Sequence, residues 1–338
     1  MDLPLPCCWS IASTLPPPSH RPLGEQSLKA WIERCGPEAM DPPGLLATPL
    51  PALDDPEGSA LPKSLPPVID AHVHLFPEPI FEALWRWFDH YGWPVRYKLH
   101  ARQVIDFQLR RGLDHLIGLH YAHKPGVARE LNRFMAEIAH PRVTPVATVH
   151  PDDPDPTDIL REGFAMGLQG VKLHCHVQAF APDDERMQAI YQLCQDRAQV
   201  LVMHAGREPK SPAYPVDTYA ICGAERVDAV LLAFPGLKLC VPHLGADEFA
   251  SYARLAERYD NLWLDTTMMA ADYFPGPPLD QLLRVRRDRL LFGTDFPNIP
   301  YAWDREVKQL VAQRLPEADL AALLGGNARA LWKLPEVH

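Results

Sequence analysis

From Pro67 to the end of the chain, short runs of apolar and β-branched residues alternate with longer stretches in which apolar residues recur every three to four positions. The short runs predict buried strands, and the longer stretches predict amphipathic helices. The expected strands are Val68–Leu75, Leu116–Tyr121, Thr144–His150, Gly170–His176, Val200–Ala205, Leu237–Leu244, Leu262–Thr266 and Leu290–Asp295. The expected helices are Ile80–His90, Val127–Ala139, Thr157–Met166, Glu185–Arg197, Val227–Phe234, Phe249–Tyr259, Leu279–Arg287, Arg305–Leu315 and Ala318–Trp332.

Eight strands that alternate with helices indicate parallel strands joined by helical crossovers. About 270 residues in eight such units match a closed barrel, which typically needs roughly 250 residues. We therefore predict an α/β fold, a (β/α)8 TIM-like barrel that forms a single catalytic domain. An open doubly wound sheet is the alternative. It would be expected to carry a phosphate-binding or dinucleotide-binding loop, and neither G-x-G-x-x-G nor G-x-x-x-x-G-K follows a strand.

The first 64 residues have a different composition, because they hold 13 of the 37 prolines and only one short helical stretch, Ser27–Arg34. A segment of this kind cannot bury enough apolar surface to offset the loss of chain entropy. We expect residues 1–64 to be a disordered Pro-rich extension and residues 65–338 to be the barrel. A translation start at Met40 is a further hypothesis, and the intact mass of the natively expressed protein would reject it if residues 1–39 were present.

The charge balance narrows the class of partner. The 338 residues include 33 Lys and Arg against 43 Asp and Glu, a formal charge of −10. This acid excess argues against binding to nucleic acid or to an anionic membrane surface. Seven irregularly spaced cysteines favour reduced thiols over a disulfide framework. With no apolar run near the roughly 20 residues of a membrane span, and no signal-peptide pattern, we expect a cytoplasmic protein that acts on a small molecule.

Histidines gather at the C-terminal ends of the expected strands, which hold nine of the 15 in the chain. In a barrel these ends share one mouth, where such folds carry their chemistry. The nine are His72, His74, His120, His123, His150, His174, His176, His204 and His243, and Asp295 ends the last strand.

His72 and His74 are two positions apart in a strand, so both side chains face the same side. Two such imidazoles can chelate one first-row divalent ion. The alternative is a pair of polar residues that are satisfied by hydrogen bonds at a strand end. Because His204, His243 and Asp295 occupy equivalent strand ends, the metal-binding interpretation becomes the stronger one.

Six segments of the chain form an ordered set of motifs: VIDAHVH at Val68–His74, GVKLH at Gly170–His174, MHAG at Met203–Gly206, PHLG at Pro242–Gly245, GTDFP at Gly293–Pro297 and GGNARAL at Gly325–Leu331. The set resembles the amidohydrolase superfamily, in its amidohydrolase-related (amidohydrolase 2) branch. The resemblance covers residues 66–334, and that branch includes both hydrolases and aromatic-acid decarboxylases.

The resemblance implies that His72, His74, His204 and Asp295 hold one Zn²⁺, with an open position for water or substrate. Asp295 would accept a proton from the attacking water, whereas its structural alternative is a helix N-cap. The resemblance also gives His243 the part of an acid/base or electrophilic residue. His243 has two alternative roles, as a further metal ligand or as a histidine buried in the core.

Lys172 leaves two interpretations open. In some members of the superfamily a lysine on the fourth strand is carboxylated and bridges two metals, which would here make His204 and His243 ligands of a second ion. We favour one ion, with Lys172 as a contact of an anionic substrate. His174 and Arg207 are candidates for the same contact, with a polar lining and a solvated loop charge as their respective alternatives. Residues 172, 174 and 176 are expected to share one face of the strand.

The loop Glu208–Tyr219 is expected to lie over the mouth as a lid. Aromatic residues that follow the first strand are expected mainly to pack in the core, with Trp93 or Tyr97 available to line a pocket.

The leading functional hypothesis is a metal-dependent hydrolase that opens an amide, ester or lactone bond of a small polar, anionic molecule. The second is a metal-dependent, non-oxidative decarboxylase or hydratase that acts on an aromatic or unsaturated carboxylic acid. A metal-binding barrel without turnover is disfavoured because His243 and Asp295 are present, and a deoxyribonuclease is disfavoured by the net charge. The resemblance also implies a homodimer, because dimers are common among such barrels.

Overall fold

The computed structural model describes residues 52–208, 213–214, 216–273 and 277–335. All strand pairings in these residues are parallel, in the orders β1-β2-β3 and β4-β5-β6-β7-β8-β9. The strands are β1 (Ile69–His74), β2 (His115–Leu119), β3 (Val143–Pro145), β4 (Ala147–Thr148), β5 (Val171–His174), β6 (Val200–His204), β7 (Lys238–Val241), β8 (Leu262–Asp265) and β9 (Leu290–Leu291).

Two sets of main-chain hydrogen bonds join these strands into one closed barrel. β3 and β4 are consecutive halves of one barrel strand, here called a stave. Val146 N donates to Gly118 O of β2 on one side, and Ala147 N donates to Gly170 O, just before β5, on the other. The first and last staves are joined by hydrogen bonds from Ala71 N to Phe292 O (2.9 Å) and from His74 N to Phe296 O (2.8 Å). The TIM-barrel fold predicted from the sequence is therefore confirmed.

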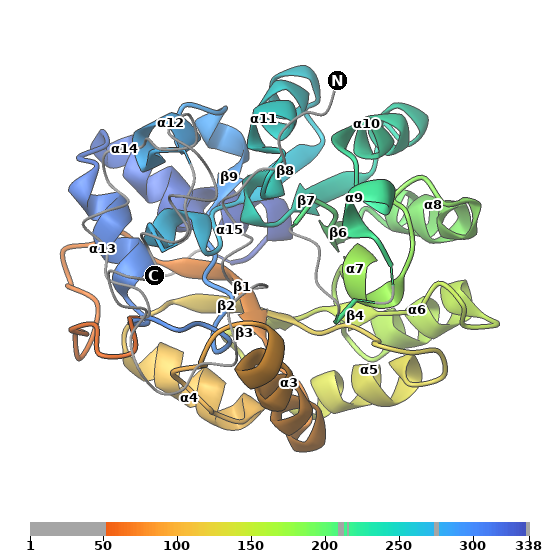
Figure 1. Ribbon diagram of the computed structural model, residues 1–338, viewed down its shortest axis with the longest axis horizontal. Coiled ribbons are helices and arrows are strands. Elements are labelled where there is room, and N and C mark those ends of the chain that lie inside the picture. The colour runs from red at the N-terminus through yellow and green to blue at the C-terminus, as the bar shows by residue number, and fades with distance from the viewer. Residues whose placement is uncertain (1–51, 209–212, 215, 274–276, 336–338) are drawn as a thin grey trace.

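Helices form a ring around the strands (Figure 1). They include α3 (Glu78–Tyr91), α4 (Ala101–Arg110), α5 (Ala128–Glu137), α6 (Pro156–Ala165), α8 (Gln188–Asp196), α10 (Ala224–Ala233), α11 (Phe249–Arg258) and α13 (Arg305–Ala312). Helix α4 is not among the expected helices, although its buried positions 101, 104, 105, 108 and 109 follow the helical repeat. In the described parts of the chain, no helix combines the length and apolarity needed to cross a bilayer.

The C-terminal helix α15 (Asn327–Trp332) closes the end of the barrel at which the strands begin. Its Ala328, Leu331 and Trp332 pack in one buried cluster with side chains from the barrel interior, such as Ile69 and Val202. The single helix expected over residues 318–332 is interrupted, because α14 (Glu317–Ala321) leads into a π-helical turn at Ala322–Gly326. With this end filled, the opposite mouth carries the accessible chemistry.

Several strands end earlier than the sequence pattern predicts. β5 stops at His174, and a one-turn helix α7 (Cys175–Gln178) follows, so His176 does not lie on the strand face. β7 stops at Val241, and His243 adopts a positive φ of 55°. The expected helix Leu279–Arg287 is reduced to α12 (Leu279–Leu282). These breaks give the mouth of the barrel its irregular loops.

The boundary of the barrel domain lies upstream of residue 65. Asp55 Oδ2 accepts a hydrogen bond of 2.7 Å from Arg305, and the Trp303 indole donates to Gly58 O over 3.0 Å. Glu57 forms an ion pair of 3.0 Å with Arg96. Residues 52–64, which the sequence assigned to the loose extension, are thus fixed to the barrel, and residues 1–51 lie outside the described part.

Candidate metal centre and cavity

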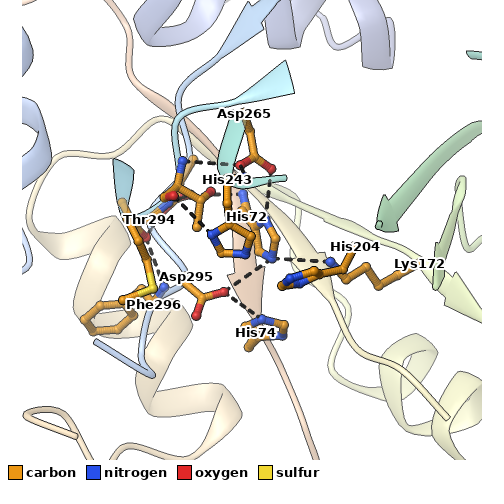
Figure 2. Close-up of polar contacts among 12 residues, drawn as sticks. His72, His74, Lys172, His204, His243, Asp265, Thr294, Asp295 and Phe296 are labelled. Atoms are coloured by element: carbon orange, nitrogen blue, oxygen red, sulfur yellow. Dashed lines mark hydrogen bonds and ion pairs between the residues drawn. The ribbon is translucent and has the colours of Figure 1, made fainter. Parts of the chain in front are cut away.

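Three potential metal ligands converge where the first and last strands meet. His72 and His74 extend from β1, and Asp295 follows β9 with a φ of 67°. Asp295 Oδ1 lies 3.0 Å from His74 Nε2 and 3.4 Å from His72 Nε2. Figure 2 shows both rings directed at this carboxylate. All three side chains are largely buried, and their ligand atoms lie within 4.8 Å of one another.

The orientation of His72 is set by Asp265 at the end of β8. The Nδ1–H of His72 donates to Asp265 Oδ2 over 2.9 Å, and the other oxygen of Asp265 accepts from His243 N over 3.0 Å. Burial lowers the pKa of His72 to about 4, helped by the positive charge of Lys172, so the ring is neutral at pH 7. Its Nε2 is therefore an acceptor that faces the acceptor Asp295 Oδ1, and such a pair favours a cation between them.

Lys172 supplies one cation in this region. Its Nζ lies 3.4 Å from His72 Nε2, on the side opposite Asp295 (Figure 2), and the residue is fully buried. Burial lowers the pKa of Lys172 to about 8, against the attraction of Asp265 and Asp295. Lys172 does not line the cavity, so the structure does not bring it to the position of a substrate contact.

His204, which the sequence analysis grouped with the first three ligands, instead contacts Glu208. Its Nε2 meets Glu208 Oε1, and Glu208 Oε2 lies 3.2 Å from Nδ1 of His176. Burial would raise the pKa of Glu208, but the two adjacent imidazoles hold that pKa well below its usual value. Glu208 is not among the expected site residues, although its place four residues after a strand-end histidine is a usable signal.

His243 lies between these two groups of residues. Its ring centroid is 5.6 Å from that of His72 and 4.6 Å from that of His204. The Nδ1–H of His243 donates to Thr267 O over 3.1 Å. Its Nε2 is thereby left to exchange a proton with a molecule in the cavity, which His243 lines.

The mouth contains a cavity of about 520 Å³ with mostly apolar walls. Aromatic lining residues are Trp87, Phe88, Tyr91, Trp93, Tyr121 and Tyr214. Polar lining residues include His74, His174, His204, Glu208, His243 and Asp295. Among the described lining residues there is no lysine and no arginine. The cavity therefore suits an apolar or aromatic molecule whose reacting group lies at the histidine-rich end.

Several other expected side chains lie away from the cavity. Arg207 is held by Glu248 Oε1 at 3.2 Å and by Tyr219 O at 3.0 Å, so it is not available to a substrate there. Tyr97 is buried, donates a hydrogen bond to Glu57 and is not among the described lining residues of the cavity. His120, although near a strand end, is buried against Asn132 of α5.

The family comparison covers the whole barrel, because a family model described as Amidohydrolase matches residues 69–334. Among curated proteins, no sequence matches the chain.

Solved structures share the fold. An uncharacterised TIM-barrel protein from Bordetella bronchiseptica is 21% identical, with a TM-score of 0.58 over 78% of this chain and 97% of that one. A 5-carboxyvanillate decarboxylase from Novosphingobium aromaticivorans, complexed with manganese and a nitrobenzoic acid, is 16% identical, with a TM-score of 0.62 over 82% and 99%. A 2,6-dihydroxybenzoate decarboxylase is 18% identical, with a TM-score of 0.57 over 80% and 99%.

Proposed function

The chain belongs to the amidohydrolase family, and we propose that it is a metal-dependent hydrolase of a small, uncharged molecule with a large apolar part. One observation carries the proposal: the ligand atoms of His72, His74 and Asp295 converge at one end of a cavity whose walls are aromatic and aliphatic. The bond to be broken is an ester, lactone or amide, and the apolar part of the molecule lies against the aromatic wall.

The residues present fit a divalent ion. Two imidazole nitrogens and a carboxylate oxygen form a donor set that zinc prefers and manganese accepts, and His72 Nδ1 is already fixed by the carboxylate of Asp265. We assign Zn²⁺ as the first choice, held by His72, His74 and Asp295. When bound, such an ion polarises a carbonyl oxygen and lowers the pKa of water towards neutrality.

The remaining steps belong to side chains of this protein. Asp295, a carboxylate that faces the cavity, accepts the proton of the attacking water. His243 Nε2 takes up that proton and passes it to the leaving group, because its Nδ1–H is committed to Thr267 O and the ring orientation is fixed. Lys172 is buried beside His72 and does not contact the substrate. Its positive charge balances the negative charges of the buried carboxylates Asp265 and Asp295.

The cavity lining supports an uncharged substrate and departs from the anionic one that the sequence suggested. The described lining residues contribute two carboxylates, Glu208 and Asp295, and no fixed cation. A free carboxylate deep in the cavity would lose its hydration without gaining an arginine or lysine partner. The aromatic wall contributes through apolar contact and ring stacking.

A non-oxidative decarboxylase of an aromatic acid is the second candidate. The aromatic lining fits such a molecule, and two solved structures that share the fold are aromatic-acid decarboxylases. The scarcity of cationic groups in the described lining makes it the less favoured of the two, because the acid would have to rely on the metal alone.

A substrate panel separates the two candidates. Protein reconstituted with Zn²⁺ or Mn²⁺ is incubated with aryl esters, aryl-fused lactones and anilides, and in parallel with hydroxybenzoic acids. Hydrolysis without release of CO₂ is the expected result, and release of CO₂ alone would overturn the hydrolase. His243→Asn keeps a donor for Thr267 O but removes Nε2, so kcat should fall at least about 100-fold while the metal remains bound.

A further inference from the structure

A second pocket lies at the end of the barrel opposite the mouth, where the closing helix meets the start of the first strand. We call it the α15 pocket. Its walls are Pro66 and Pro67 on the segment that enters β1, the π-helical turn Ala322–Gly326 and α15 itself. The pocket has a volume of about 580 Å³, and its described lining shares no residue with the cavity at the mouth.

The π-helical turn gives the α15 pocket its shape. A Cβ on Gly325 would lie 2.5 Å from Pro67 O, so the backbone of the turn lies directly against the segment before β1. Beside this contact the wall is formed by alanines and by Gly326, whose small size leaves the space open. π-Helical turns are rare and occur frequently at functional sites.

Two cationic side chains line the α15 pocket, Arg329 and Lys333, and the described lining includes no Asp or Glu. The main-chain oxygen of Arg329 accepts hydrogen bonds from Lys333 N and Leu334 N, so this carbonyl is already paired at the end of the helix. Arg329 Nη1 donates to Pro335 O. Its Nη2 is buried and has no hydrogen-bond partner among the described residues. A buried donor of this kind calls for a bound water or ion, and a guanidinium group pairs best with an oxyanion.

Other groups near the two cations are positive or neutral. Burial lowers the pKa of His115, at the start of β2, to about 4, and the positive charges of Arg329 and Arg142 contribute to this shift. Partial burial and the charge of Lys333 also lower the pKa of Lys238, at the start of β7. These residues create a positive potential around the α15 pocket, although the whole chain has a formal charge of −10.

We infer that the α15 pocket binds a small organic anion. The carboxylate or phosphate group of this ligand pairs with Arg329 and Lys333. Its apolar part lies against Pro66, Ala330 and Leu334. The ligand thereby joins the segment before the first strand to the helix that closes the barrel, so its binding stabilises the folded protein. The site is separate from the reaction proposed at the mouth and does not depend on it.

Isothermal titration calorimetry and thermal unfolding of the full chain test the inference, with benzoate, phenyl phosphate and inorganic phosphate as probes. Benzoate or phenyl phosphate should bind and raise Tm, and the tighter of the two identifies the preferred anionic group. Inorganic phosphate should bind more weakly than phenyl phosphate, because it lacks the apolar part. Equal affinities for these two phosphates would overturn an organic ligand.

Three variants locate the bound anion. Arg329→Gln should weaken binding at least about tenfold, because it removes a charge-assisted hydrogen bond. Lys333→Gln, at an exposed position, should weaken it about threefold. Ala330→Trp keeps both cations but fills the pocket, and it should weaken binding at least about tenfold. Full affinity in all three variants would overturn the inference.

Arg254→Gln is the matched control, because it removes one positive charge from an exposed residue of α11 that does not line the pocket. An equal loss of affinity in this control would reveal a general effect of net charge and overturn the site. Binding that is lost in Trp87→Ala but kept in Arg329→Gln would place the anion at the mouth and also overturn it. The absence of binding by every probe at about 10 mM would overturn the site and leave the proposed function standing, because hydrolysis is measured separately. Circular dichroism of each variant confirms that the fold is retained.

Discussion

His72 donates from Nδ1 to Asp265 Oδ2 over 2.9 Å while its Nε2 faces Asp295 Oδ1 at 3.4 Å. Asp265 therefore selects the tautomer of His72 with the proton on Nδ1. Asp295 lies beside Nε2, the nitrogen that is left unprotonated. The two aspartates come from neighbouring staves, β8 and the residues after β9. Their separation across the His72 ring gives them different tasks, although both are deprotonated: burial raises the pKa of each, but nearby histidines hold it below its ordinary value.

Asp265→Asn should weaken binding of the metal ion proposed at His72, His74 and Asp295 by about 10- to 100-fold. The oxygen of asparagine can still accept from His243 N, but its NH₂ group would face His72 Nδ1 and favour the tautomer with the proton on Nε2. That proton would then lie on the nitrogen directed at Asp295. Competition with a chromophoric chelator measures the affinity, and Asp106→Asn, at an exposed residue that pairs with Arg110, is the control. Equal affinities in both variants would contradict the role of Asp265.

Trp87→Ala should reduce kcat/KM for aryl substrates at least tenfold, mainly through KM, because the ring forms part of the apolar wall. Its ring centroid lies 5.9 Å from that of Tyr214 across the mouth. Substrates with a short acetyl group in place of the aryl group serve as the internal control and should change little. An equal loss for both substrate classes would show that the substitution disturbs the reacting end instead of the wall.

The protein should lose stability as pH falls below about 6.5. Burial lowers the pKa of His120 to about 3 from its usual 6.5, so below pH 6.5 the unfolded chain binds a proton that the folded chain does not. The stability is complete above pH 6.5 and declines as pH falls towards 3, by about 2 kcal/mol between pH 7.5 and 5 from this residue. His120→Gln keeps a donor for Asn132 and does not titrate. Urea unfolding at the two pH values should show a smaller decline for this variant than for the wild type.

Asp55→Asn should lower the free energy of unfolding by about 1–3 kcal/mol, because it removes the charged partner of Arg305. The two side chains are 14% and 9% exposed, and their ion pair of 2.7 Å fixes the segment before β1 to α13. Asp54→Asn, at the exposed neighbouring position, should change stability by less than about 0.5 kcal/mol. Denaturant titration gives the unfolding free energy of each variant. Equal losses for Asp55→Asn and Asp54→Asn would mean that the Asp55–Arg305 ion pair contributes nothing to stability.

The barrel could be predicted from the sequence because its strands depend on local pattern. Buried parallel strands are short apolar runs, and the side-chain period of two places His72 and His74 on one face. The register shift in β1 falls between Asp70 and Val73 and so includes His72, yet Nε2 of both His72 and His74 still faces Asp295. Helix α4 shows that a periodic signal can be overlooked when polar residues such as Gln108 occupy buried positions.

The cluster of His176, His204 and Glu208 could not be predicted, because it depends on where loops place side chains. His176 was expected on the strand face with His174, yet β5 ends at His174 and a helical turn brings His176 to Gly206 instead. Glu208 reaches His204 because the chain turns back after β6, and no periodicity encodes that turn. Arg207, the adjacent residue, turns towards Glu248 by the same local geometry.

Closure of the barrel between its first and last staves has a consequence for biosynthesis. His74 and Asp295 are 221 positions apart, and the helix that plugs the barrel comes later still. A ribosome delivers the N-terminal part of a domain first, so both histidines of the first strand exist as free side chains for most of translation. They acquire their carboxylate only when the last stave is made. Assembly of this three-residue cluster must therefore follow synthesis of the last stave, and a chain that stops before β9 carries both histidines but not Asp295.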